Sequence, residues 1–502
     1  MPTRIHRLIL IVAALTFVTV VLKMISQLSS TEPDLTRSSI VSGSVKEFVA
    51  VWVTHKRTHY LERSLVSFLN QRHNEKFDMI VSLDAPSAES RVRSLLSRLE
   101  SEYSRSIRLV FKASEGKTFF TFQYKNEQAV DQHIFSAIRL AFSNDHPFGV
   151  IIEEDLELAP DFLDLMITSA PVLAKDQTLF CVSAWNDNGF KGQVSDPSAL
   201  MRTDILPGLG FMLTRSSAMS LLKMWKGNDF WGWDFWMRRS IANDLRECIA
   251  PEIPRVLHIG EGGIHIKENS FYEKLMDVAK ISGGLGTFEK TVNTLTLDSY
   301  DKRLKEAIDE ANLIPIEQAR DTNHHLNNGG TYKSVFPHGN CEGLAGTRFK
   351  LFGDCRMMHR GVITVKIIEP GITIFLIDAR VGAEWLTADL IERPVGLKPL
   401  ASEVGESCES RCEREKFICS AIDHFHVNNC AVAQGISGCL QCKATDSHRG
   451  SAILSDPSES QCLVSRKTGF FCREVLPNDR KSICPCVPRL PYLTFSHDVN
   501  YK

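Results

Sequence analysis

Short apolar runs alternate with amphipathic segments from Glu47 onward, and this alternation constrains the fold more than any other feature of the sequence. The runs that read as strands are 48–54, 77–83, 107–111 and 149–152, and the segments that read as helices are 60–69, 89–103, 128–142 and 160–173. Strands that alternate with helices form a largely parallel sheet with helices on its faces. We therefore expect an α/β fold with a mostly parallel sheet.

Charged residues follow three of the expected strands. Arg57 follows the first, Asp84 ends the second, and Glu153, Glu154 and Asp155 end the fourth. Because ligands of open α/β sheets bind at the carboxyl ends of the strands, we expect all five at the ligand edge. No GxGxxG follows the first strand and no GxxxxGK[ST] occurs, so dinucleotide and P-loop chemistry have little support.

The three adjacent carboxylates repel one another unless a cation is present. A hard divalent ion coordinated by oxygens, with phosphate and water in its remaining positions, is a natural partner for them. The alternative is a solvated acidic turn before a helix, where acidic residues are favoured in any case. The triplet alone leaves both interpretations open.

An apolar segment near the N-terminus predicts a lumenal protein. Residues 8–22 are uncharged and largely apolar, somewhat shorter than the roughly 20 residues of a usual span, and basic residues precede them. The positive flank places that end in the cytosol. A cleaved signal peptide and an uncleaved anchor both fit, but no A-x-A site follows, so we expect a cytosolic tail and signal-anchor at 1–26. A stem rich in Ser and Thr follows at 27–45.

The charge balance gives no reason to expect a nucleic-acid partner. The 502 residues include 58 basic and 60 acidic side chains, so the formal net charge is −2. Nucleic-acid binding normally requires a basic surface, which this composition does not supply.

Ten of the fourteen cysteines lie between Cys408 and Cys486, in a region with few long apolar runs. Crosslinks would supply the stability that such a small core cannot, and a lumenal location favours disulfides. A zinc site that uses Cys439 and Cys442 is the alternative. We expect a disulfide-rich domain at 400–490, whose connectivity cannot be read from the sequence.

Four longer motifs follow one another along the chain: EEDLELAPDF at 153–162, CVSAWNDNG at 181–189, RTDILPGLG at 202–210 and WDFWMRR at 233–239. Together they resemble the β-1,2-N-acetylglucosaminyltransferase I family of the Golgi, which includes an N-glycan enzyme and a protein O-mannose enzyme. The resemblance covers about residues 46–385, which we take as the catalytic domain. It implies a GT-A glycosyltransferase fold with a Rossmann-like, mostly parallel sheet, UDP-GlcNAc as donor, Mn²⁺ as cofactor and inversion at the anomeric carbon.

The resemblance also implies roles for single residues on the donor side. Asp155 matches the metal-binding carboxylate, while Glu153 and Glu154 are expected to face the sugar and ribose. Glu154 stands where the N-glycan enzyme has Asp. The other matched donor-contacting positions are Arg57, Asp84, His133, Ile264 and His265. The last two belong to a glycine-rich loop that closes on the donor in the family, and His265 replaces a Ser or Asn there.

On the acceptor side, Trp233 and Asp234 match a Trp-Asp pair whose aspartate is the catalytic base of the family. A positioned base accelerates attack by a weakly nucleophilic hydroxyl by ~10²–10⁴-fold. Burial of a carboxylate among tryptophans costs free energy unless the carboxylate is paired or takes part in catalysis, which favours a catalytic Asp234 over a purely hydrophobic cluster. Trp236 is expected to be a core residue. Arg238 matches an arginine that holds charge at the same catalytic site, and Leu209 lies in a segment expected to pack under the sugar.

The resemblance extends to cysteines outside the tail. Cys181 and Cys248 match a family disulfide, whereas His55 and Ala85 stand where a second family pair would be. Cys341 and Cys355 would then pair with each other. The tail itself, roughly 404–488, is similar to the cysteine-rich segment of the β-1,6-N-acetylglucosaminyltransferase V enzymes, which suggests contact with the acceptor glycoprotein.

The implied activity is transfer of N-acetylglucosamine to the 2-hydroxyl of an α-linked mannose on a glycoprotein, by a single-pass type II protein of the Golgi membrane. Residues 231–238 and the stretch from Ser299 to Gly361 are closer to the O-mannose enzyme, while 186–189 and 202–204 are closer to the N-glycan enzyme, so both acceptors stay open. An inactive lumenal glycan-binding protein is the alternative, against which the intact Asp155 and Asp234 argue. A glycosidase with two carboxylates has little support.

Overall fold

The computed structural model describes residues 46–111, 125–225, 232–243, 246–260, 287–322, 325–344, 348–449, 452–454, 461–467, 470, 472–477 and 479–488. All of them belong to one compact unit, Lys46–Lys502. None of the helices within these ranges is long and apolar enough to cross a membrane. The expected anchor at 1–26 and stem at 27–45 lie outside the described residues.

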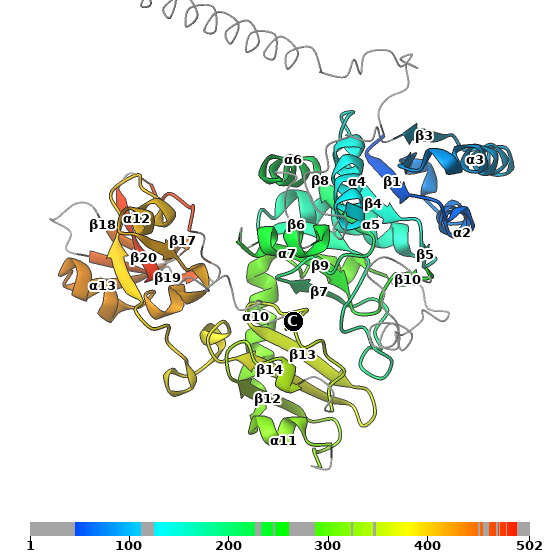
Figure 1. Ribbon diagram of the computed structural model, residues 1–502. Coiled ribbons are helices and arrows are strands. Elements are labelled where there is room, and N and C mark those ends of the chain that lie inside the picture. Colours follow the sequence, from blue (N-terminus) through cyan, green and yellow to red (C-terminus); the bar gives the residue numbers. More distant parts are fainter. Residues whose placement is uncertain are drawn as a thin grey trace, which may run out of the picture. The chain divides into compact units, whose positions relative to one another are not determined.

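An eight-stranded sheet, in the order β3-β2-β1-β4-β8-β6-β9-β7, forms the first part of the fold (Figure 1). Its strands are β1 (Phe48–Thr54), β2 (Phe77–Leu83), β3 (Ile107–Phe111), β4 (Phe148–Glu153), β6 (Leu179–Ser183), β7 (Leu200–Thr203), β8 (Phe211–Thr214) and β9 (Glu247–Pro251). The first four are mutually parallel. β8 is antiparallel to both β4 and β6, and β7 is antiparallel to β9. The parallel sheet predicted from the first four strands is therefore confirmed, and the sheet becomes mixed beyond β4.

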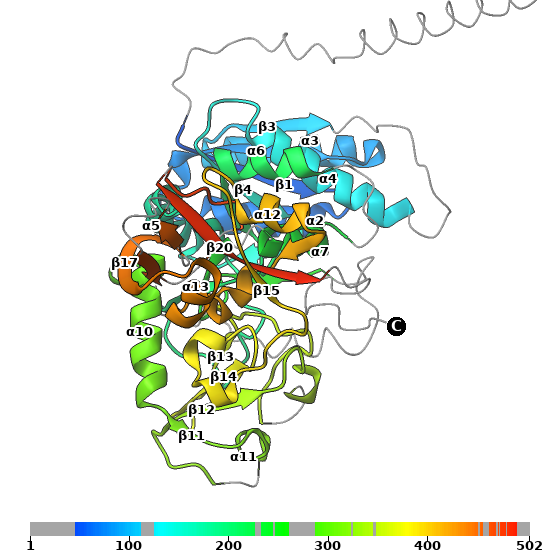
Figure 2. The same ribbon diagram turned by 90° about the vertical axis from the view of Figure 1, so that its left-hand side faces the viewer.

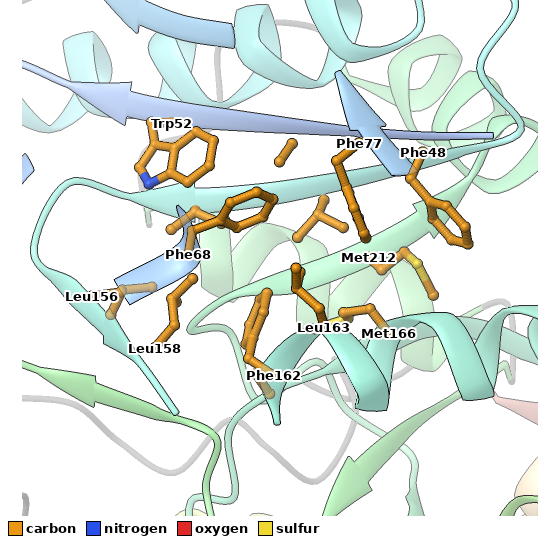
Figure 3. Close-up of a cluster of buried hydrophobic side chains, with 14 of the residues drawn as sticks. Phe48, Trp52, Phe68, Phe77, Leu156, Leu158, Phe162, Leu163, Met166 and Met212 are labelled. Carbon is orange, nitrogen blue, oxygen red and sulfur yellow. The ribbon is translucent and has the colours of Figure 1, made fainter. Parts of the chain in front are cut away.

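Helices cover both faces of this sheet, and every residue of β1 is therefore buried. α2 (Thr58–Leu69), α3 (Glu89–Tyr103) and α5 (Phe162–Lys175) pack on the face that carries Phe48 and Trp52, and α4 (Lys125–Ala141), α6 (Arg215–Met224) and α7 (Trp233–Asn243) pack on the opposite face, with Val49 and Val51. Successive residues of a strand point to opposite faces, so a strand buried on both sides is apolar throughout. Figure 3 shows the first cluster, in which Phe68 of α2 packs edge-on against Trp52 and Phe77 and to which Phe162 of α5 also belongs.

The observed elements follow the expected ones closely. The bounds of β1, β2, β3 and α3 are those read from the sequence, and α4 begins three residues before the expected start at 128. α5 begins at Phe162 rather than at Pro160, with Asp161 preceding its first turn. The local apolar pattern was therefore sufficient to locate the first half of the sheet and its helices.

A second, four-stranded sheet has the order β11-β12-β14-β13. It comprises β11 (Asn312–Leu313), β12 (Thr331–Phe336), β13 (Val362–Ile367) and β14 (Ile372–Asp378), with α9 (Glu289–Val292), α10 (Leu297–Glu310) and α11 (Ile316–Arg320) nearby in the sequence. Ile308 of α10 packs against Val362 and Phe375, so α10 covers this sheet (Figure 2). A two-stranded sheet pairs β5 (Leu156–Leu158) with β10 (Val256–His258). Short 3₁₀ helices lie at Asn74–Lys76, Pro86–Ala88, Glu342–Leu344, Ala383–Trp385, Ala388–Leu390 and Ala421–His426.

The cysteine-rich tail folds around a third group of strands, among them β20, drawn as a red arrow in Figure 2. Its elements are β15 (Lys398–Ala401), α12 (Cys408–Arg414), β16 (Phe417–Cys419), α13 (Cys430–Ser437), β17 (Gln441–Arg449), β18 (Ala452–Leu454), β19 (Gln461–Lys467) and β20 (Arg480–Pro488). Its disulfides are Cys408–Cys484, Cys412–Cys486, Cys419–Cys472, Cys430–Cys442 and Cys439–Cys462. The zinc alternative is wrong, because every cysteine of the described part is in a disulfide. The predicted α/β fold with a mostly parallel sheet and a small disulfide-rich C-terminal part is confirmed.

Candidate active site

The acidic triplet lies at the carboxyl end of β4, beside the end of β1. Glu153 is in register with Val53, and the Glu154 N–H donates to the Val53 carbonyl at 3.0 Å. The Glu154 carboxylate, only 3% exposed, accepts hydrogen bonds from the Thr54 hydroxyl and, at 2.9 Å, from the His55 N–H. The parallel pairing of β1 with β4 thus anchors Glu154 on the end of β1.

Arg57 joins the two neighbouring carboxylates. Its Nε donates to Glu154 Oε1 at 2.8 Å, and its Nη2 donates to Asp155 Oδ2 at 2.6 Å. Burial would lower the pKa of Arg57, but Asp155 and Glu154 outweigh it and raise that pKa. Arg57 therefore supplies a positive charge from within the chain, which relieves part of the repulsion among the three carboxylates.

The electrostatic balance differs among the three acids. Burial would raise the pKa of Asp155, but His258, whose Nε2 lies 3.4 Å from Asp155 Oδ2, and Arg57 hold that pKa below its usual range. Desolvation and the negative charges of Asp155 and Asp234 raise the pKa of Glu153 to about 8. Asp234 belongs to α7, so the end of β4 and the first turn of α7 act on the same carboxyl group.

The structure brings Asp84 and His133 side by side. His133, on α4 and 3% exposed, has its Nε2 2.9 Å from the Ser82 hydroxyl and its Nδ1 3.4 Å from Asp84 Oδ2. Asp84 Oδ1 also lies 2.6 Å from Nδ1 of His55. Burial would raise the pKa of Asp84, but His133 and His55 lower it to about 2. We did not predict His55 as a site residue. The available signal was that His55 occupies the position of a family cysteine that this chain lacks.

Asp234 and Arg238 lie one turn apart on α7. Asp234 Oδ2 is 3.8 Å from Arg238 Nη2, and a third of the Asp234 side chain is exposed. The premise that Asp234 is buried among tryptophans is therefore wrong, because the first turn of α7 opens to solvent at this position. Trp233 itself is buried, with 7% of its surface exposed, and its ring stacks on that of Phe211 with 5.9 Å between the ring centroids.

The other two tryptophans of the motif have different outcomes. Trp236 packs edge-on against Phe135 and Trp225, at 5.2 and 5.0 Å, as expected for a core residue. Trp231 lies outside the described residues.

Three glycines shape the backbone in two segments that were predicted to belong to the site. Leu209, partly buried against the core, stands between Gly208 and Gly210, whose φ angles are +100° and +66°. Side chains rarely adopt such angles, which favours glycine at both positions. A Cβ on Gly260 would lie 2.4 Å from Asp155 Oδ2, so the chain passes directly over that carboxylate. The expected donor contacts Ile264 and His265 follow Gly260 but lie outside the described residues.

The expected metal ion can be tested against the donor atoms present. Within the described ranges, no three His, Cys, Asp or Glu side chains converge as they would in an all-protein metal site. A small hard cation such as Mg²⁺ is commonly bound by one or two carboxylates plus substrate phosphates. Asp155 fits that arrangement, because it lies in the turn directly after β4 and its pKa is lowered.

A network of charged residues and a cavity of about 360 Å³ lie elsewhere, between β7, α10 and β13, and none of the predicted site residues lines the cavity. There, Arg202 pairs with Glu247, and His359 lies 2.7 Å from both Glu247 and Asp301. The predicted disulfide Cys181–Cys248 is present and joins β6 to β9, and Cys341 pairs with Cys355 as expected.

Comparisons with known proteins identify the family of the chain. The model of the GNT-I family matches residues 20–384. The alpha-1,3-mannosyl-glycoprotein 2-beta-N-acetylglucosaminyltransferase of Arabidopsis thaliana is 30% identical over 277 residues, which are 54% of this chain and 60% of that protein. The match thus spans less than two thirds of the relative's length.

Two solved structures resemble the chain only weakly. The similarity to residues 1–349 of TarS from S. aureus covers 42% of this chain and 59% of the TarS chain, with 8% identity and a TM-score of 0.30. The mannosyltransferase PcManGT of Pyrobaculum calidifontis, in complex with GDP-Man and Mn²⁺, covers the same shares with 16% identity and a TM-score of 0.27. Likeness of this degree establishes no relationship, whereas the family match covers well over half of the sequence. The chain belongs to the GNT-I family.

Proposed function

We propose that this protein transfers N-acetylglucosamine from UDP-GlcNAc to the 2-hydroxyl of an α-linked mannose on a glycoprotein, as an inverting, metal-dependent glycosyltransferase. One observation carries the proposal: Asp155 at the end of β4 and Asp234 on α7 both act on the pKa of Glu153. The expected metal-binding carboxylate and the expected base therefore lie within electrostatic range of the same carboxyl group, which supports a donor sugar bound between them. Membership of the GNT-I family supports the assignment.

The donor side would bind the nucleotide through residues at three strand ends. Asp84 is ionised at neutral pH, since its pKa is about 2, and it is a fixed acceptor for N–H or O–H groups of the nucleotide. Arg57 holds Asp155 in place by the hydrogen bond from Nη2. A divalent cation at Asp155 would supply Lewis-acid stabilisation of the charge that develops on the leaving diphosphate.

The acceptor side would supply the base. The partial exposure of Asp234 leaves its carboxylate accessible to a sugar hydroxyl, and Arg238 is close enough to hold charge without a hydrogen bond to it. In this mechanism Asp234 takes the proton of the 2-hydroxyl as that oxygen attacks the anomeric carbon. Attack and departure occur on opposite faces, so the configuration inverts.

Location and partners follow from the same proposal. The apolar segment at 8–22 with its basic flank supports a type II anchor in the Golgi membrane, with the catalytic residues in the lumen. Mannose-bearing glycoproteins are the proposed acceptors, and the disulfide-rich tail is a candidate surface for contact with them.

The test is an assay of the full-length protein in detergent with UDP-GlcNAc, Mn²⁺ and two acceptors, an N-glycan core and an O-mannosyl peptide. Transfer to one of them supports the proposal and decides the acceptor. Absence of transfer to any mannoside, with tight mannoside binding retained, would instead establish the glycan-binding alternative.

A further inference from the structure

A buried carboxylate lies behind Arg238. Asp187, in the segment after β6, is 3% exposed. Its Oδ1 accepts hydrogen bonds from Trp185 Nε1 and Arg356 Nη1, both at 3.2 Å. Its Oδ2 accepts a hydrogen bond from none of the described residues and lies 4.0 Å from Arg238 Nη2. Each oxygen of Asp187 therefore faces a different arginine.

Arg238 Nη2 in turn lies between two carboxylates. Asp187 Oδ2 is on its buried side and Asp234 Oδ2, at 3.8 Å, is on its exposed side. The Nε of Arg238 donates to the Leu206 carbonyl at 3.1 Å, which fixes the near end of the guanidinium. Water screens the buried charge less than the exposed one, so Asp187 attracts the guanidinium inward.

Asp187 is held in place by Arg356, whose own position is fixed by its neighbours. Arg356 Nε donates to both oxygens of Asp354, at 2.9 and 2.8 Å, and its guanidinium lies 4.4 Å from the Phe352 ring centroid. The Asn188 side chain donates to the Arg356 carbonyl at 3.1 Å. The Cys341–Cys355 disulfide closes the same segment, so Arg356 has little freedom to leave Asp187.

We propose that Asp187 is a positioning residue of the transfer reaction, acting through Arg238. The inference rests on the proposed function and deepens it, because it connects the segment around Arg356 to the predicted base. With Asp187 in place, Arg238 stays beside Asp234 without a hydrogen bond to it, and the base remains available to the acceptor hydroxyl. Without the Asp187 charge, Arg238 moves onto Asp234 and occupies the oxygen that the acceptor needs.

The experiment replaces Asp187 by Asn, which keeps the shape of the side chain and removes its charge, in the full-length protein. We expect kcat to fall by ~10–100-fold, the usual cost of losing a group that orients a functional residue. The KM for UDP-GlcNAc and its binding, measured by titration, should not change, because Arg57 and Asp84 are untouched. The matched control is Asp423→Asn, the same change at a buried carboxylate that accepts hydrogen bonds from Arg380 at 3.1 and 2.8 Å. The control should lower the Tm and leave kcat unchanged.

A double-mutant cycle separates positioning from general stability. In an Arg238→Ala background, Asp187→Asn should cause no further loss of kcat, because the residue through which Asp187 acts is gone. Equal loss in both backgrounds, an unchanged kcat in the single variant, or a parallel loss of UDP-GlcNAc binding would overturn the proposal. A wild-type protein that transfers to no mannoside would contradict the proposed function instead, and the two failures are therefore distinguishable.

Discussion

Asp131 Oδ1 accepts a hydrogen bond from the Trp233 backbone N–H at 2.7 Å, which ties α4 to the first turn of α7. Both residues are buried. His133, two positions further along α4, contacts Asp84, and Asp234 is next to Trp233. One helix therefore connects the predicted nucleotide side of the site to the predicted base.

The first prediction concerns this connection. Asp131→Ala should cost about 0.5–2 kcal/mol of stability, as for other lost helix caps, and should also lower kcat because the first turn of α7 shifts. Thr214→Ala is the matched control, since the Thr214 hydroxyl caps α6 by accepting from the Ser217 N–H at 3.1 Å. Calorimetry should show similar stability losses for the two variants. The transfer assay should show a lowered kcat only for Asp131→Ala. A normal kcat for Asp131→Ala would rule out the positioning role.

The second prediction concerns the base. Asp234→Asn should reduce transfer by ~10²–10⁴-fold, since amide nitrogen and oxygen cannot take the hydroxyl proton. UDP-GlcNAc binding should stay near normal, because Asp234 lies on the acceptor side. Single-turnover kinetics with a titration of the donor check both expectations, and retained turnover would remove Asp234 from this role.

The third prediction concerns Arg57, which bonds Glu154 and Asp155 at once. Arg57→Lys keeps the charge but cannot span both carboxylates, because an ammonium lacks the guanidinium fork. We expect a higher KM for UDP-GlcNAc and a higher Mn²⁺ concentration for half-maximal rate, with the KM for the acceptor unchanged. Arg63→Lys, at an exposed pair with Glu157, is the control and should change none of the three quantities.

The fourth prediction concerns pH. Burial would lower the pKa of His359, but Glu247 and Asp301 raise it to about 9. A raised histidine pKa stabilises the fold below pH 6.5, and this contribution is lost as the pH rises through 9. Burial also raises the pKa of Asp204 and of Glu384 to about 8, which acts in the same direction. The free energy of unfolding should therefore fall between pH 6.5 and 9, and His359→Gln should flatten that slope in urea titrations. An unchanged slope would contradict the assignment.

The fifth prediction compares two disulfides of the first 400 residues. Cys181 and Cys248 are 67 residues apart, and Cys341 and Cys355 are 14 apart. Longer loops lose more entropy when crosslinked, so replacing each pair by Ser should cost about 4 and about 3 kcal/mol respectively. Chemical denaturation of the two double variants measures the difference, and the reverse order would show that strain or residual structure dominates.

The sequence by itself determined the first half of the sheet, because each strand and helix there has its own local apolar period. β1, β2, β3 and α3 begin and end where the pattern predicts. It also placed the charged residues at the strand ends and located the dense group of cysteines. Those features depend on neighbours in the chain and so can be read one segment at a time.

Only the tertiary structure decided which charged groups meet. Arg57 neutralises part of the triplet. Asp187 lies behind Arg238, although the two residues are 51 positions apart in the sequence. The exposure of Asp234, which contradicts the expected burial, follows from how the first turn of α7 packs. The physical reason is that the strength of an ion pair depends on distance and burial, and parallel strands with crossover helices bring together groups that are far apart in the chain.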